Sequence, residues 1–432
     1  MHRRLLMYTN TNTIPLYIGI DIGKNVHSFG AYAGANLNLV HAAEDVHSNK
    51  AGFEHFQKWI QGRLNKYHPI TIGLEPTGIY HEPWVYAIRQ AYGNAVTLKF
   101  LNPYQTKQKR KQLQNGRSRK TDPIDVEAIA HCLRDGQGST ACLAQKQEAQ
   151  FQLWMTEYHQ VRKRRQRLLT NLSTQMDRLW PGALVDVRRF KNAHPDLEPP
   201  TPLLLSRPFD RQLLQVIIKH RPNPHDWKHQ SLEAIEVFFR QHGRRCGPKT
   251  AQKVSEVVNH ALLLPSYLTK ELAIRLQEDF SLFQRVSQRL DMLKRRAEDL
   301  VPHTKAAVLT TFSGISHFLA AQYLAYVIDP ARFDHADQIW ALAGFDPGRN
   351  DSGDRRFTGE ISRRGQPGFR STLYQIGLNT SQCCSVIRKC KQRALQRGKG
   401  RVGATVHAAH KANRICFHLL AHQVAFDPTK AR

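Results

Sequence analysis

The chain has little of what marks several common protein classes. Its 432 residues include seven cysteines, an odd number, with no C-x-x-C pair. Neither a disulfide framework nor a zinc ribbon is therefore expected, and a reducing compartment is indicated. No apolar run approaches the roughly 18 residues of a membrane span. The start, MHRRLLMYTNTNTIPLY, lacks the continuous apolar core of a signal peptide. We expect a cytoplasmic protein with no membrane partner.

Acidic residues are also scarce relative to basic ones. The chain has 35 Asp and Glu against 63 Lys and Arg, which gives a formal net charge of +28. The basic residues recur from the first residues to the last, so the charge does not belong to one tail. A field of this sign favours a polyanionic partner, of which DNA and RNA are the commonest.

Strand and helix signals alternate over residues 15–135. Their order is β-β-β-α-β-α-β-α. The first three strands are joined by short turns and can pair antiparallel, whereas the later ones need helical crossovers. The pattern predicts a mixed α/β sheet.

The strand signal disappears from about residue 147. A long helix there carries an apolar stripe on one side and VRKRRQR on the other. Residues 182–225 look irregular. A later helix has apolar residues at heptad spacing, which fits either an oligomer contact or an ordinary helix packed within the chain. The two rows of this seam are Leu276, Phe283 and Leu290, and Val286, Leu293 and Leu300.

Four carboxylates stand at positions that suggest a common site. Asp21 ends the strand in YIGIDIGK, and Glu75 ends the strand in ITIGLE. Asp122 and Asp125 lie three apart in KTDPIDVEAIA, so a helix would turn them the same way. Divalent cations such as Mg²⁺ prefer oxygen ligands of this kind, and two such ions can promote phosphodiester chemistry.

Each carboxylate also has a structural explanation. Asp21 can close a turn, Glu75 can be a solvated strand end, and Asp122 before a proline fits a helix N-cap, with Asp125 at the third position. The G-x-D-x-G pattern in GIDIG also occurs in actin-fold sugar kinases, but the further glycine-rich turns of such kinases are not evident. Taken together in a basic chain, the four carboxylates favour a metal cluster, and the kinase is the weaker alternative.

Several segments, in order, resemble one protein family. YIGIDIGK, LEPTGIY and KTDPIDVEAIA, followed by FSGISHFLAAQYLAYV and FDHADQIWALAGFDPGRNDSGDRRFTGEISRRG, are similar to DEDD transposases of the insertion-sequence one-ten type, which include the Piv-type DNA invertases. The resemblance implies a RuvC-like, RNase-H-type first domain. It also implies that Asp21, Glu75, Asp122 and Asp125 are catalytic and bind Mg²⁺ or Mn²⁺.

The same resemblance implies a nucleophilic serine, Ser352 in Asp-Ser-Gly, which would hold DNA as a phosphoserine ester. Ser362 and Ser371 are local competitors, and Ser371 is expected to cap a helix. A composite site across domains or subunits would bring the serine and the metal together. The alternatives are a metal-dependent RuvC-like junction nuclease that uses water, and a basic nucleic-acid-binding protein whose carboxylates are structural.

Two basic groups are expected to contact nucleic acid, because Lys and Arg bind backbone phosphates and stabilise developing charge. The second group lies in a glycine-rich segment, which predicts a loop. The residues are Lys99, Lys107, Lys109, Arg110, Lys111, Arg117, Arg119 and Lys120 in the first group, and Arg349, Arg355, Arg356, Arg363 and Arg364 in the second.

Strand exchange requires several active sites, so a dimer or tetramer is expected to act on double-stranded DNA. The resemblance implies a guide RNA encoded by the element. We expect a bacterial protein that is associated with the nucleoid. We expect five segments along the chain. They are an N-terminal extension (1–14), the RuvC-like domain (15–145), a helical and coiled-coil middle (146–304), a mostly α-helical serine domain (305–395) and a basic helical tail (396–432).

Overall fold

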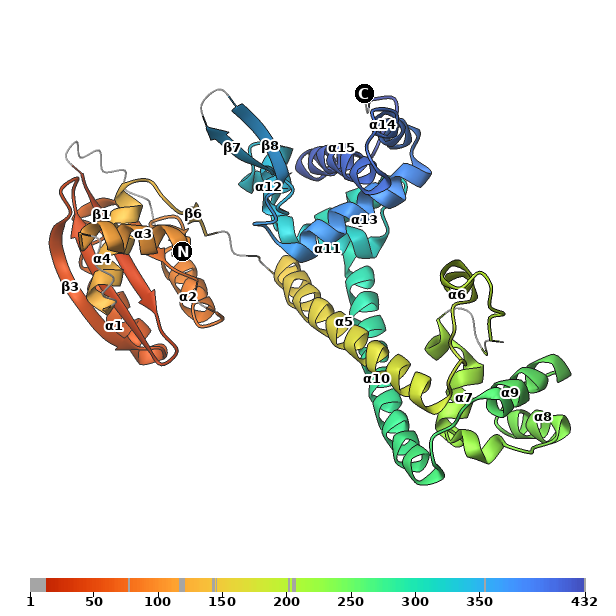
Figure 1. The fold of residues 1–432 in the computed structure, drawn as a ribbon. Helices are drawn as coiled ribbons and strands as arrows, with labels where there is room; N and C mark the ends of the chain where they lie inside the picture. The colour runs from red at the N-terminus through yellow and green to blue at the C-terminus, as the bar shows by residue number, and fades with distance from the viewer. Residues whose placement is uncertain are drawn as a thin grey trace. The chain divides into compact units, whose positions relative to one another are not determined.

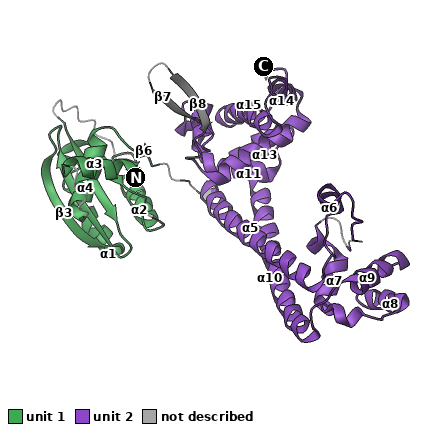
Figure 2. Ribbon diagram, in the orientation of Figure 1, with its two compact units in different colours: residues 1–143 green, residues 144–432 purple. Residues whose placement is uncertain are grey.

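The chain forms two compact units, residues 1–143 and 144–432 (Figure 2). Each is a folded body with cores of its own. The structure describes only the backbone of Lys146 and of residues 347–352 and 355–360. The computed structural model describes residues 13–76, 78–115, 121–141, 144, 146–200, 203, 207–352 and 355–430.

The first unit contains a six-stranded mixed sheet in the order β3-β2-β1-β4-β5-β6. The first three strands pair antiparallel, β4 and β5 continue parallel to β1, and β6 is antiparallel to β5. The predicted mixed α/β sheet is confirmed. The strands are β1 (Ile14–Ile22), β2 (Val26–Ala33), β3 (Asn38–His47), β4 (Tyr67–Leu74), β5 (Thr97–Phe100) and β6 (Ser139–Thr140).

Helices cover both faces of this sheet. On one face, aliphatic residues of β1 and β4 form a core with α1 and α2, including the rings of Phe56 and Trp84. On the other face, α4 packs against β1 (Figure 1). The helix α3 was not predicted from the sequence. The helices are α1 (Lys50–Gln61), α2 (Glu82–Tyr92), α3 (Pro103–Leu113) and α4 (Asp122–Arg134).

The second unit is mostly helical, and two long helices run through it: α5 (Lys146–Leu179) and α10 (Ser266–Leu300). They are antiparallel, because Arg289 pairs with Glu157 while Asp279 pairs with Gln175. Leu276, Phe283, Val286 and Leu293 of the predicted heptad rows are buried. Of the two explanations for the heptad seam, packing within the chain accounts for these residues.

The segment between α5 and α10 forms a helical subdomain with its own core around Trp180 and Trp227. The indole N–H of Trp180 donates to the Pro222 carbonyl at 2.7 Å. Part of this segment, residues 182–225, was predicted to be irregular. That prediction is wrong where α6 and α7 form. The helices are α6 (Val187–Ala193), α7 (Gln212–His220), α8 (Leu232–Gln241) and α9 (Pro248–His260).

The remaining helices share a core that includes the fully buried Tyr323, whose hydroxyl donates to Asn413 Oδ1 at 3.0 Å. A β-hairpin stands where the sequence predicted a loop. Its strands are short of large aliphatic residues, so apolar patterning does not reveal them. The elements are α11 (His317–Val327), α12 (Ala336–Leu342), β7 (Pro347–Ser352), β8 (Arg355–Ile361), α13 (Pro367–Cys383), α14 (Ser385–Gln396) and α15 (Arg401–His422).

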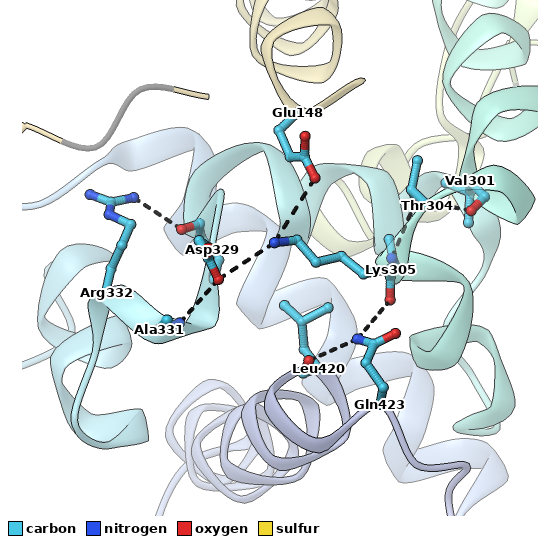
Figure 3. A network of polar contacts seen from close by, with 11 residues as sticks. Glu148, Val301, Thr304, Lys305, Asp329, Ala331, Arg332, Leu420 and Gln423 are labelled. Atoms are coloured by element: carbon cyan, nitrogen blue, oxygen red, sulfur yellow. Dashed lines mark hydrogen bonds and ion pairs between the residues drawn. The ribbon is translucent and has the colours of Figure 1, made fainter. Parts of the chain in front are cut away.

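A polar network ties the start of α5 to this helical body (Figure 3). The Lys305 ammonium lies 3.5 Å from Asp329 Oδ1 and 4.0 Å from Glu148 Oε1. The Gln423 amide donates to the carbonyl of Leu420 at 2.8 Å and approaches that of Lys305 at 3.4 Å.

Within the described ranges, no helix has both the length and the apolar character that crossing a membrane would need.

Candidate carboxylate site and serine hairpin

Three glycines let α4 lie directly on the sheet. A Cβ at Gly19 of β1 would lie 2.4 Å from the Val126 carbonyl oxygen of α4. At Gly30 of β2 it would lie 2.8 Å from a Val126 methyl group, and at Gly73 of β4 it would lie 2.7 Å from the Leu133 side chain. At Gly19 the obstacle is backbone and leaves no room for a larger residue, whereas at Gly30 and Gly73 the side chains of α4 would have to shift. The glycines therefore mark the face that α4 covers.

Asp21 and Glu75 follow from this strand geometry. Ile20 pairs with Leu74 in the parallel register of β1 and β4, so Asp21 and Glu75 come next on neighbouring strands. Side chains alternate between faces along a strand. Asp21 is two residues beyond Gly19, and Glu75 is two residues beyond Gly73. Both are thus at positions that face α4, at the carboxyl edge of the sheet.

Asp125 reaches the same face from the first turn of α4. Asp125 as a residue is only 6% exposed, and its Oδ1 accepts a hydrogen bond from Arg110 Nη1 at 2.6 Å. A buried carboxylate is tolerated when it is paired, and a position near a helix N-terminus also favours its negative charge.

Asp122 is the first residue of α4, and Thr121 occupies the N-cap position. The structural explanation of Asp122 as the N-cap is therefore wrong by one residue. Unlike Asp125, the side chain of Asp122 is exposed to solvent. Asp21 and Glu75 thus face α4, Asp125 belongs to the first turn of α4, and Asp122 is exposed at the start of the same helix.

Glu75 has a hydrogen-bond donor that the sequence reading did not single out. Thr106 of α3, 3% exposed, donates its hydroxyl to Glu75 Oε2 at 2.7 Å. The same hydroxyl oxygen lies 3.1 Å from the Pro103 carbonyl. The capping box of Asn102 and Gln105 around Pro103 marks the start of α3. That signal could have located the helix, and hence Thr106, from sequence.

The donor set suits a hard divalent cation, because Asp21, Glu75 and Asp125 offer only carboxylate oxygens. Among the residues that the structure describes, however, no group of three or more His, Cys, Asp or Glu side chains is arranged to hold one ion. The shared face and the ligand chemistry fit Mg²⁺ or Mn²⁺. The assignment of the four carboxylates as metal ligands stays a prediction.

The predicted basic contacts around α3 divide by environment. Lys107 and Lys111 are exposed. Lys109 Nζ lies 2.6 Å from Asp135 Oδ2, and this hydrogen bond lowers the pKa of Asp135. Lys99 Nζ lies 3.4 Å from the Gly136 carbonyl, and Arg110 is engaged by Asp125. Three further predicted contacts fall outside the described residues: Arg117, Arg119 and Lys120.

Ser352 is the last residue of β7, and its backbone pairs with that of Arg355 in β8. Residues 353 and 354 between them, and the side chains of Ser352, Arg349, Arg355 and Arg356, lie outside what the structure describes. The hairpin thus carries the predicted nucleophile beside its turn. Arg363 and Arg364 follow the end of β8; Arg364 is exposed.

The base of the hairpin is closed by Ser362 and Asp346. The Ser362 hydroxyl donates to Asp346 Oδ1 at 2.6 Å, and the Ser362 N–H donates to the Asp346 carbonyl at 2.8 Å. The Ser362 oxygen also accepts from the Arg364 N–H at 3.3 Å. This competitor of Ser352 therefore has a structural role.

The expectation that Ser371 caps a helix is wrong. α13 begins at Pro367 with Gln366 at its N-cap, so Ser371 lies inside the helix and its side chain is exposed. Proline at the first helical position is the signal that fixes this start.

Comparison with known protein families gives two matches. Residues 18–181 match the model of the DEDD transposases of the IS110 type. Residues 306–392 match the model described as Transposase IS116/IS110/IS902 family. The first match includes all four carboxylates, and the second includes the hairpin and Ser352. No curated protein matches the chain.

Proposed function

The chain belongs to the IS110-type DEDD transposases, and on that premise we propose that it cuts and rejoins DNA through a divalent-metal carboxylate site and a phosphoserine intermediate. The enzyme is a transposase, so its substrate is DNA. The proposal extends to the residues that perform the chemistry, to the guidance of the enzyme by RNA and to its assembly.

The observation that carries the proposal is the common placement of Asp21, Glu75 and Asp125 on the α4 face of the sheet. A sheet of three antiparallel strands followed by parallel β4 and β5 also supports a RuvC-like, RNase-H-type first domain. Carboxylates at the ends of neighbouring strands, joined by one from a packed helix, can hold a cation against a DNA phosphate.

Asp21, Glu75, Asp122 and Asp125 would hold Mg²⁺ or Mn²⁺. When bound, such an ion polarises the phosphodiester and stabilises charge on the attacking and leaving oxygens. The buried position of Asp125 fixes its carboxylate, and the hydrogen bond from Thr106 fixes that of Glu75, before substrate arrives. Preorganised ligands avoid the cost of reorganisation during the reaction.

Ser352 is proposed to supply the nucleophile. Its hydroxyl oxygen attacks the phosphorus, a phosphoserine bond forms, and the bond from phosphorus to the deoxyribose oxygen breaks. The serine proton is lost, and the departing strand end takes up a proton to leave as an alcohol. A hydroxyl of a second DNA end then attacks the phosphoserine and regenerates Ser352. One phosphodiester is consumed and one is formed, so no ATP is needed.

The arginines of the hairpin region are proposed to bind the phosphate under attack. Guanidinium groups form bidentate hydrogen bonds with phosphate oxygens and neutralise charge that develops in the transition state. A serine hydroxyl is a weak nucleophile without activation, which gives these cations and the metal site a direct role. The residues are Arg349, Arg355, Arg356, Arg363 and Arg364.

We further propose that a structured RNA guides the enzyme and that a dimer or tetramer performs strand exchange at the bacterial nucleoid. The net charge of +28 supports binding of more than one nucleic acid segment. Sequencing the RNA that copurifies with the protein, expressed from its complete element, tests the guide. Recovery of no element-encoded RNA above a matched control would contradict it.

The function is tested by an excision and insertion assay in cells that carry the element ends. We expect activity from the wild type and its loss in Asp21→Ala and in Ser352→Ala. Ser371→Ala is the matched control, because Ser371 is exposed inside α13 and should retain activity. Full activity of Ser352→Ala with loss in Asp21→Ala would instead indicate metal-dependent strand transfer without a phosphoserine intermediate.

A further inference from the structure

One face of α3 holds two of the proposed catalytic carboxylates. Thr106 donates to Glu75 Oε2 at 2.7 Å, and Arg110 donates to Asp125 Oδ1 at 2.6 Å. Residues four apart lie on the same side of a helix. Although α3 contributes no carboxylate of its own, it contacts one at a strand end and one on a neighbouring helix.

The position of α3 is fixed at both ends. Its first turn is closed by the capping box of Asn102 and Gln105. Towards its end, Lys109 and Arg110 form ion pairs with Asp135 and Asp125. The chain enters α3 from β5, where the Leu101 N–H donates to the Leu74 carbonyl at 3.0 Å, immediately before Glu75. The Thr106 hydroxyl is therefore presented to Glu75 by a fixed backbone.

The contact between Thr106 and Glu75 has the character of a directed hydrogen bond. A threonine hydroxyl has a single hydrogen to donate. Its two acceptors are the Glu75 carboxylate at 2.7 Å and the neutral Pro103 carbonyl at 3.1 Å. Hydrogen bonds to ionised acceptors are shorter and stronger than those to neutral ones. The geometry favours the carboxylate as the partner.

We propose that Thr106 is a positioning residue of the metal site, which orients the Glu75 carboxylate towards a divalent cation. The inference rests on the proposed metal function of Glu75. A carboxylate whose Oε2 accepts from Thr106 keeps its remaining lone pairs in a fixed direction. Residues that orient metal ligands in this way change metal affinity by about 10- to 100-fold when they are lost.

A purely structural role for Thr106 makes different predictions. If Thr106 only filled space on α3, the isosteric Thr106→Val would bind metal like the wild type. If it only stabilised the first turn through Pro103, its loss would lower stability without changing metal affinity. A positioning role instead requires that Thr106→Ser, which keeps the hydroxyl, retains wild-type metal affinity.

The test is Mn²⁺ binding to the full chain, measured by electron paramagnetic resonance of the free ion, with thermal unfolding measured in parallel. We expect the Kd for Mn²⁺ to rise about 10-fold or more in Thr106→Val and to stay near the wild-type value in Thr106→Ser. Thr106→Ala is the second variant, should Val disturb folding. Thr380→Val is the matched control, because Thr380 is also buried and its hydroxyl donates to the Ile376 carbonyl of α13.

The outcomes separate this inference from the function on which it rests. Wild-type affinity in both Thr106→Val and Thr106→Ala, with weak binding in Glu75→Gln, would overturn the role of Thr106 and leave the metal site standing. Mn²⁺ binding that is unchanged in Glu75→Gln and Asp21→Asn would overturn the proposed metal site itself.

Discussion

Arg110 Nη1 lies 2.6 Å from Asp125 Oδ1, and this ion pair joins α3 to α4 where the proposed metal ligands gather. The side chain of Asp125 is 7% exposed and that of Arg110 is 20% exposed. The carboxylate is thus neutralised by a residue of the protein. A divalent cation at the same carboxylates would supply positive charge of the same kind.

Arg110→Ala should therefore destabilise the first unit. Loss of one partner of a buried ion pair costs about 3 to 5 kcal/mol, and the 20% exposure of the Arg110 side chain places the expected loss at the lower end of that range. Added Mg²⁺ should reduce the difference in stability between Arg110→Ala and the wild type, because a ligand that binds the folded state stabilises it. Thermal unfolding with and without Mg²⁺ measures both effects. Lys109→Ala is the control, because its partner Asp135 is 27% exposed and a loss of below about 1 kcal/mol is expected. Equal losses of stability in Arg110→Ala and Lys109→Ala would show that burial of the paired carboxylate does not set the size of the loss.

Gly19→Ala should displace α4 from the sheet. The new methyl group would meet the Val126 carbonyl oxygen at 2.4 Å, and a backbone atom cannot move aside as a side chain can. We expect a loss of about 3 kcal/mol or more in the free energy of unfolding, together with weaker metal binding.

Gly62→Ala is the matched glycine control for that variant. Gly62 has right-handed helical backbone angles, and the nearest atom to an added Cβ lies 3.9 Å away. Urea denaturation compares the two variants. A Gly19→Ala protein as stable as Gly62→Ala would show that α4 does not lie against β1 as described.

Ser362→Ala tests which serine is the nucleophile. Its hydroxyl closes the base of the hairpin on Asp346, and loss of a hydrogen bond to a charged group costs about 1.5 to 3 kcal/mol. We expect slower transposition but continued formation of a covalent protein–DNA adduct. Asp346→Asn should have a similar effect, because it weakens the same hydrogen bond. Complete loss of the adduct in Ser362→Ala, with the fold intact, would make Ser362 the nucleophile.

His27 should make the first unit sensitive to acid. The ring is buried edge-on against Trp84, and burial lowers the pKa of His27 below its usual 6.5. Below pH 6.5 the unfolded chain takes up a proton on this histidine while the folded chain does not. Stability is therefore lost as the pH falls from 6.5 towards the folded pKa. Urea denaturation at pH 7 and pH 5.5 should show a smaller loss in His27→Phe than in the wild type. An equal loss of stability in the wild type and in His27→Phe would show that protonation of His27 does not cause the sensitivity to acid.

Lys107 and Lys111 should contribute phosphate contacts, because both are exposed on α3. Each lost contact reduces the slope of log K against log salt concentration by about 0.9 on duplex DNA. Lys107→Gln with Lys111→Gln should lower the slope by roughly 1 to 2 for that reason. The control is Lys50→Gln with Lys58→Gln on α1, which packs on the other sheet face. Equal slopes for the two double variants would contradict a specific contact surface.

Much of the first unit could be predicted because its strands alternate regularly. Leu16, Ile18 and Ile20 are all fully buried on one face, which leaves Asp21 on the other. The helix α3 escaped prediction because its single buried residue is Thr106. A helix with one buried polar residue and many lysines has almost no apolar periodicity.

Contacts between distant residues could not be predicted in the same way. Ser362 and Asp346 meet because the register of the hairpin brings them together across 16 residues. Thr106 reaches Glu75 across 31 residues through the path of β5 and α3. Local sequence patterns contain no information on such a register.

The most direct test of the account is a search for the covalent protein–DNA adduct. The protein is expressed with its element ends and Mg²⁺, denatured, and separated from free DNA, in the wild type, Ser352→Ala and Asp21→Ala. The account predicts an adduct in the wild type that is absent from both variants, with the DNA attached at Ser352 by peptide mapping. Cleaved DNA without an adduct, unchanged in Ser352→Ala and lost in Asp21→Ala, would contradict the phosphoserine step.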